Sequence, residues 1–142
     1  MTNVTFYLIP EEHEHARQRL SCQLASQFCL RLIPTHIHAA KPEYAAQLDE
    51  LLWEYPPNRF VPHIMANERS NQCLVTVSHE KVFSGNGGAL INTTPEIPEM
   101  VGLFDEVCEL VLANERPRAR DQYKEYRSRQ FDLRHKELDQ WE

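Results

Sequence analysis

The sequence predicts an α/β fold, a three-layer sandwich built on a largely parallel sheet. Short segments rich in β-branched and aromatic residues alternate with longer segments whose apolar residues recur at helical spacing. The predicted order is β-α-β-α-β-β-α-α, and helices between strands favour parallel pairing with helices packed on the sheet. With 142 residues, 42% of them hydrophobic and 25% charged, the chain is expected to form one domain over residues 1–142.

The first half of the chain supplies two strands and two helices. Residues 2–9, TNVTFYLI, have strand composition and stop before a proline. A helix is expected from about residue 13 to residue 31, because its apolar residues recur every four positions. Residues 34–39 are a candidate for a short second strand, and a helix with proline in its first turn is expected over about residues 42–53.

The second half is predicted to contain a hairpin and two more helices. Residues 54–71 are expected to form an ordered loop, and strands at 73–77 and 89–92 flank a glycine-rich turn typical of hairpins. Residues 95–98 lead into a helix whose apolar spacing continues to residue 111. Pro117 suits the first turn of a final helix that runs to about residue 136.

The charge is unevenly distributed. The chain has a net charge of −6, yet residues 116–136 hold eight of the fifteen basic residues against three acidic ones. This segment therefore carries +5 and the remainder −11. A negative body disfavours broad nucleic-acid binding, whereas a local basic cluster can hold one anionic partner. This pattern favours an adaptor over an enzyme.

Other features argue against a membrane, metal or cofactor protein. No apolar run approaches the roughly 20 residues of a membrane span, and the acidic N-terminus lacks signal-peptide character, so a cytoplasmic location is expected. The four cysteines are scattered, which is typical of small buried side chains in a reducing compartment. The histidine pairs suggest no set of three or four convergent ligands, and we predict no metal and no cofactor.

Enzyme signatures are also missing from the sequence. Neither GxGxxG after the first strand nor GxxxxGK[ST] is present, and the glycines at 85, 87 and 88 lie between two strands. Cys73 and Cys108 lie in apolar patterns that favour inert thiols. A small nucleotide- or metabolite-utilising α/β enzyme and a direct single-stranded DNA binder remain the alternatives.

Two constellations could carry binding. Residues 53–63, WEYPPNRFVPH, are rich in rings and prolines, and they form either a lid on the core or exposed anchors for a partner. Arg120, Tyr123, Lys124 and Arg127 share one face of the final predicted helix. That face is either merely solvated or captures an acidic peptide, with a guanidinium clamping a carboxylate.

The chain resembles the chi subunit family of the bacterial DNA polymerase III holoenzyme. The resemblance covers nearly the whole chain, in order, through residues 3–8 (NVTFYL), 48–53 (LDELLW), 60–63 (FVPH), 104–107 (FDEV) and 120–127 (RDQYKEYR). It implies a fold like that of mononucleotide-binding, Rossmann-like proteins but without a phosphate loop, which agrees with the missing motifs.

The resemblance also implies a function. A member of this family is a noncatalytic accessory subunit of the clamp-loader complex that bridges the psi subunit to the acidic C-terminal tail of single-stranded DNA-binding protein during DNA replication. It implies a psi surface, which a DNA-repair helicase can also occupy, at Trp53, Pro56 and Phe60. It implies a tail site at Val111, Arg120, Tyr123, Lys124 and Arg127. No sequence-specific DNA binding is expected.

Overall fold

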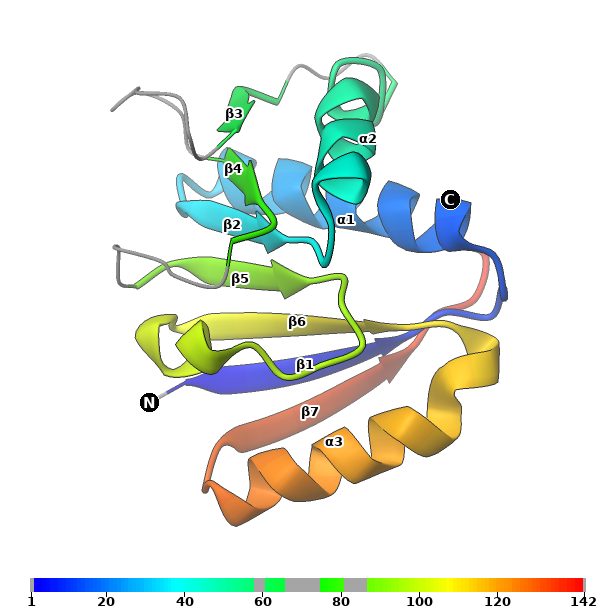
Figure 1. Ribbon diagram of the computed structural model, residues 1–142, viewed down its shortest axis with the longest axis vertical. Coiled ribbons are helices and arrows are strands. Elements are labelled where there is room, and N and C mark those ends of the chain that lie inside the picture. The colour runs from blue at the N-terminus through cyan, green and yellow to red at the C-terminus, as the bar shows by residue number, and fades with distance from the viewer. Residues whose placement is uncertain (1, 58–60, 66–74, 81–86, 142) are drawn as a thin grey trace.

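Seven strands form one sheet in the computed structural model, which describes residues 2–57, 61–65, 75–80 and 87–141. Every pair of neighbouring strands is parallel, in the order β3-β4-β2-β5-β6-β1-β7 (Figure 1). The strands are β1 (Asn3–Leu8), β2 (Thr35–His38), β3 (His63–Met65), β4 (Val75–Ser78), β5 (Ala89–Asn92), β6 (Glu106–Val111) and β7 (Asp132–Glu137).

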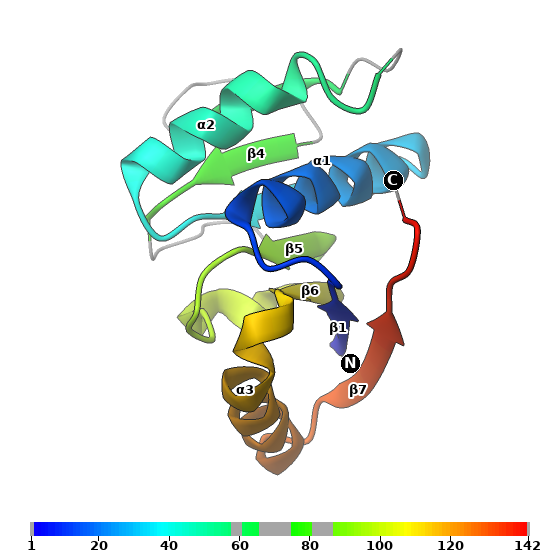
Figure 2. The same cartoon turned by 90° about the vertical axis from the view of Figure 1, so that its right-hand side faces the viewer.

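Helices cover both faces of this sheet and complete the predicted three-layer α/β sandwich. One face carries α1 (Glu14–Leu30) and α2 (Pro42–Leu52), and the other carries α3 (Arg116–Ser128) and the short 3-10 helix η1 (Glu99–Leu103). Figure 2 shows α1 and α3 on opposite sides of the central strands. A second 3-10 turn, η2 (Ala113–Glu115), leads directly into α3.

The core consists of two apolar clusters separated by the sheet. Alternation along β6 shows the division: Cys108 and Leu110 face the α1 layer, whereas Val107 and Val111 face the α3 layer. Because both faces of a central parallel strand are covered, nearly every residue of β6 is buried. The two clusters place α3 and α2 on separate surfaces of the molecule.

The first half of the chain follows the sequence prediction within one or two residues. The predicted strand at 2–9 is β1, and the helices predicted at 13–31 and 42–53 are α1 and α2. His13 caps α1, since its Nδ1 accepts a hydrogen bond from the backbone N–H of Ala16 at 3.3 Å. Pro42 occupies the first position of α2, as predicted.

The helix predicted up to residue 111 is wrong. Only the 3-10 helix η1 forms there, and the chain then enters β6, a central strand of the sheet. A strand buried on both faces is apolar at nearly every position, so it satisfies a helical spacing as readily as a strand. Burial on both faces, which periodicity cannot report, decided the structure of this segment.

The predicted hairpin is wrong as well. β4 and β5 do not pair with each other; each pairs with β2 in parallel, on opposite sides of it. Gly88 instead allows its backbone to lie close to the backbone of Pro34. Its φ is +74°, and a Cβ there would lie 2.2 Å from the carbonyl oxygen of Pro34. Residues 66–74 and 81–86, including Cys73, lie outside the described residues, and β3 lies within the segment predicted as a loop.

The final helix is shorter than predicted and is followed by a strand. Gln130 adopts a left-handed conformation (φ 67°), and the backbone N–H of Phe131 donates to the carbonyl oxygen of Tyr126. These contacts, with the rings of Tyr126 and Phe131 packed edge to face, end the helix in a Schellman motif. The chain then reverses and forms β7, which pairs with β1.

Candidate protein-binding sites

A groove of about 370 Å³ lies between α3 and β7, over the ends of the β1 side chains. Its floor is apolar and its rim is charged. The lining residues are Phe6, Leu8, Arg116, Ala119, Arg120, Tyr123, His135 and Glu137. The groove thus offers an apolar slot with guanidinium groups beside it.

The floor follows from strand alternation and helix spacing. Phe6 and Leu8 are two residues apart on β1, so both side chains point toward α3. The Phe6 ring packs against the Tyr123 ring with centroids 5.5 Å apart. Ala119 lies one turn before Tyr123 on α3, and its small side chain fills little of the space above the strand.

Two arginines of α3 and its C-cap residue Arg129 are engaged in ion pairs. Arg116 lies 3.5 Å from Glu137 of β7, Arg118 2.9 Å from Glu115, and Arg129 3.0 Å from Glu125. Within the described parts of the chain, Arg120 forms no ion pair, and its side chain is exposed at the groove. Its five N–H donors are therefore free for a carboxylate in the groove.

The structure brings some of the predicted tail-site residues together. Arg120 and Tyr123 both line the groove, and the guanidinium carbon of Arg127 lies 5.3 Å from the centroid of the Tyr123 ring. Lys124 is exposed on α3 outside the lining. Val111 ends strand β6 rather than a helix, and at 1% exposure it supports the floor from below, paired in register with Leu8.

A buried carboxylate fixes α3 on the sheet. Glu109 of β6 is 2% exposed and accepts hydrogen bonds from the Tyr126 hydroxyl at 2.5 Å and the Asn92 amide at 2.9 and 3.1 Å. Burial raises the pKa of Glu109 to about 7, although these donors lower it in part. Tyr126 is one turn from Tyr123, so this network holds the helical wall of the groove in place.

Sequence reasoning missed half of the groove. His135 falls at the end of the predicted final helix and Glu137 just beyond it, yet both belong to β7 in the structure. Phe6 and Leu8 fall in a predicted strand to which no binding role is assigned. The signal that could have found them is the two-residue spacing of large apolar side chains in residues 2–9, which marks one face of the strand.

A second surface surrounds Trp53, which directly follows α2. Trp53 is 60% exposed, and its ring and the buried His63 ring pack in a T-shaped arrangement with centroids 5.0 Å apart. His63 is itself fixed, since its Nδ1 lies 2.7 Å from the Val61 carbonyl oxygen. Pro56 is half-buried nearby in the chain, and Phe60 lies outside the described residues. Trp53 is therefore a positioned, exposed aromatic side chain.

Comparison with known proteins identifies the family. The sequence profile of the family described as "DNA polymerase III chi subunit, HolC" matches residues 1–134. The chain is 32% identical over 135 residues to DNA polymerase III subunit chi of Pseudomonas aeruginosa, covering 94% of both chains. It is 29% identical over 141 residues to subunit chi of Escherichia coli K12, covering 94% of this chain and 96% of that protein. The chain belongs to the DNA polymerase III chi subunit family.

The matched range contains the Trp53 surface and the α3 side of the groove. It includes all of α2 and α3, and the Haemophilus influenzae subunit chi, 26% identical over 133 residues, matches over 90% of the chain. The groove side chains of β7 beyond residue 134 lie outside the profile match.

The chi family member places carboxylates where a nucleotide-binding α/β protein holds phosphate. Glu14 opens α1 just after β1, and Glu11 and Glu12 precede it, so negative charge surrounds this helix N-terminus. An anionic phosphate is disfavoured there. Burial raises the pKa of the Cys108 thiol to about 12, which is typical of an inert thiol.

No helix among the described residues is long and apolar enough to cross a membrane. In the same part of the chain, no three histidine, cysteine, aspartate or glutamate side chains gather as metal ligands.

Proposed function

We propose that this member of the chi family is a noncatalytic adaptor that joins the psi subunit of the clamp loader to the acidic C-terminal tail of single-stranded DNA-binding protein during DNA replication. The observation that carries the proposal is the α3–β7 groove, where an apolar floor meets the Arg120 guanidinium, which forms no ion pair with any described residue.

The tail implied by the family is an acidic peptide that ends in phenylalanine with a free carboxylate. Such a ligand needs an apolar slot and a cation within one side chain's reach of each other. Phe6, Leu8 and Tyr123 supply the slot, and Arg120 supplies paired donors for the carboxylate. Lys124 and Arg127 add positive charge on the same helix, which attracts the upstream acidic residues and accelerates association.

The location of the two surfaces supports a bridging role. Trp53 follows α2, whereas Arg120 and Tyr123 lie on α3, and these helices lie at opposite ends of the molecule in Figure 1. Two partners can therefore occupy the chain at once. Trp53, with a rigid ring and little side-chain entropy to lose, suits the anchor of a psi interface with Pro56 and Phe60. The same surface suits a DNA-repair helicase as a competitor.

Titration of a tail peptide into two arginine variants tests the tail site. Arg120→Ala is expected to weaken binding by about 2 kcal/mol, because charge-assisted hydrogen bonds to the carboxylate are lost. Arg129→Ala, which removes the exposed C-cap arginine of α3 that is paired with Glu125, is the matched control and should bind as wild type. A peptide without its terminal phenylalanine should not bind. Equal affinity of Arg120→Ala and Arg129→Ala would contradict the assignment.

Binding of purified psi subunit tests the other surface. Trp53→Ala and Phe60→Ala are each expected to cost about 2 kcal/mol or more as interface anchors, with the tail peptide bound normally. Trp53 is largely exposed, so its replacement leaves the fold intact. Unchanged psi affinity in both variants would show that residues 53–63 have only a structural role. Nucleotide-dependent thermal stabilisation with turnover would favour the enzyme alternative instead.

A further inference from the structure

We infer that the groove between α1 and α2, beside Trp53, docks a basic segment of the protein that occupies the Trp53 surface. This inference rests on the proposed role of Trp53 in psi binding. It adds the chemistry of the bound segment: lysine or arginine side chains flanking an apolar residue.

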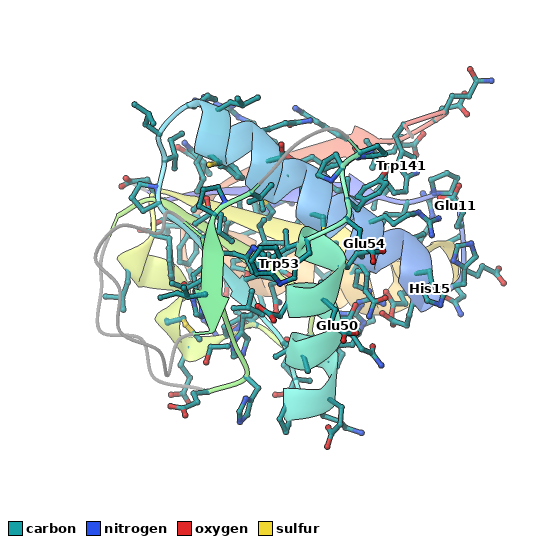
Figure 3. The ribbon with its side chains drawn as sticks, turned by 90° about the horizontal axis from the view of Figure 1, so that it is seen from above. Glu11, His15, Glu50, Trp53, Glu54 and Trp141 are labelled. Atoms are coloured by element: carbon teal, nitrogen blue, oxygen red, sulfur yellow. The ribbon has the colours of Figure 1, made fainter. Side chains whose placement is uncertain are left out.

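The groove has room for a peptide segment. Its volume is about 720 Å³, and it runs between the N-terminal half of α1 and the length of α2. Figure 3 shows Glu50 on α2 and Trp53 and Glu54 at its C-terminal end, with His15 and Glu11 on the side of α1. The lining residues are Glu14, His15, Gln18, Tyr44, Gln47, Glu50, Leu51, Trp53 and Glu54.

The charge of the lining is negative. Among the described residues that line it are three carboxylates, at Glu14, Glu50 and Glu54, and no lysine or arginine. Glu14 is already engaged, since it pairs with Arg17 at 3.0 Å and accepts a hydrogen bond from the Tyr44 hydroxyl. Glu50 and Glu54 are exposed and form no ion pair with any other described residue. These two carboxylates are therefore available to cations of a partner.

The position of the two free carboxylates is unfavourable for α2 alone. Glu50 lies in the last turn of the helix and Glu54 follows its cap, and that turn has no basic residue. Negative charge at a helix C-terminus opposes the helix dipole, and like charges four residues apart repel each other. A cation bound between Glu50 and Glu54 would relieve both effects.

The aromatic side of the groove complements the charge. Trp53 is 60% exposed and held by the His63 ring, so its remaining surface can receive a guanidinium or an apolar side chain. The half-buried Leu51 adds apolar area beside it. Trp53 thus connects the charged groove to the psi surface.

Hydrogen bonds between the two helices preorganise the floor. The Gln18 amide of α1 donates to the Gln47 side chain of α2 at 2.9 Å, and Tyr44 of α2 donates to Glu14 of α1 at 2.9 Å. Binding therefore orders few groups of this chain, which favours affinity.

Calorimetric titration of full-length variants with purified psi subunit tests the inference. The Glu50→Gln/Glu54→Gln double variant is expected to bind psi about tenfold more weakly and with a smaller salt dependence. Glu96→Gln/Glu99→Gln removes the same charge from two exposed sites outside the groove and is the matched control, expected within about twofold of wild type. Glu50→Lys/Glu54→Lys should weaken binding further, because it repels a basic segment.

The outcomes separate this inference from the proposed function. If Trp53→Ala loses psi binding while Glu50→Gln/Glu54→Gln binds like its control, the basic-segment inference is wrong and the psi surface remains. If Glu50→Gln/Glu54→Gln loses binding and Trp53→Ala does not, the groove binds psi, and the proposed role of Trp53 as a psi anchor is wrong. Sedimentation of the chain alone gives the third outcome: self-association abolished by Glu50→Gln/Glu54→Gln would assign the groove to the basic α3 of a second copy and overturn the inference.

Discussion

The buried Glu109 carboxylate predicts a specific pH dependence of stability. Its pKa rises from 4.5 to about 7 because the side chain is buried between β6 and α3. Between pH 4.5 and 7 the folded protein therefore keeps a proton that the unfolded chain has released. The free energy of unfolding falls as pH rises through this window, and the stabilisation is fully present only below pH 4.5.

The magnitude follows from the pKa difference. Each pKa unit corresponds to about 1.4 kcal/mol, so Glu109 should cost the folded state about 3 kcal/mol between pH 4.5 and pH 8. His36 acts in the opposite direction: burial beside His38 lowers its pKa from 6.5 to about 4. Its contribution to stability is lost as pH falls from 6.5 to 4, so the two effects largely cancel in wild type between pH 4.5 and 6.5.

The test therefore compares variants at several pH values. Glu109→Gln keeps the shape of the side chain and removes its titration. Relative to wild type, its free energy of unfolding in urea should rise by about 3 kcal/mol from pH 4.5 to pH 8. Glu106→Gln removes one charge from the half-buried start of the same strand and is the control to subtract. A Glu109→Gln difference that is the same at pH 4.5 and pH 8 would refute the reasoning.

Three further predictions concern α1 and the α3–β7 groove. Leu32 follows α1 and is exposed in a left-handed conformation (φ 58°), so Leu32→Gly should stabilise the protein by about 1 kcal/mol in urea denaturation. Leu30→Gly, within the last turn of α1, should instead destabilise it by about 1 kcal/mol. A change of the same sign in both variants would contradict this prediction. Glu137→Gln should tighten binding of the tail peptide about threefold in fluorescence anisotropy, because Arg116 loses a competing carboxylate in the groove; weaker binding would exclude such competition. Arg17 is 2% exposed and pairs with Glu115 at 2.6 Å, so Arg17→Met should lower the free energy of unfolding in urea by about 3 kcal/mol. A decrease below about 1 kcal/mol would show that the buried pair is dispensable.

The sequence alone determined the layers of this molecule. The four-residue apolar spacing of α1 and α2, and the strand composition of residues 2–9, reflect local requirements that each element satisfies by itself. The concentration of positive charge between residues 116 and 136 likewise marks the segment that contains α3. Arg120 and Tyr123 could be selected because helical spacing alone places them on one face.

The tertiary structure determined which strands pack beside the face of α3 that carries Arg120 and Tyr123. Strand β6 has the sequence pattern of a helix because both of its faces are buried, and a strand in the centre of a parallel sheet loses its alternation. Strand β7, by contrast, has few of the apolar residues typical of a strand, because it lies at the edge of the sheet and is mostly exposed and charged. Only its pairing with β1 makes it a strand. The groove needs Phe6 and Leu8 from one end of the sequence and His135 and Glu137 from the other. Contacts between residues so far apart depend on the complete sheet, whereas helical spacing depends only on neighbours along the chain.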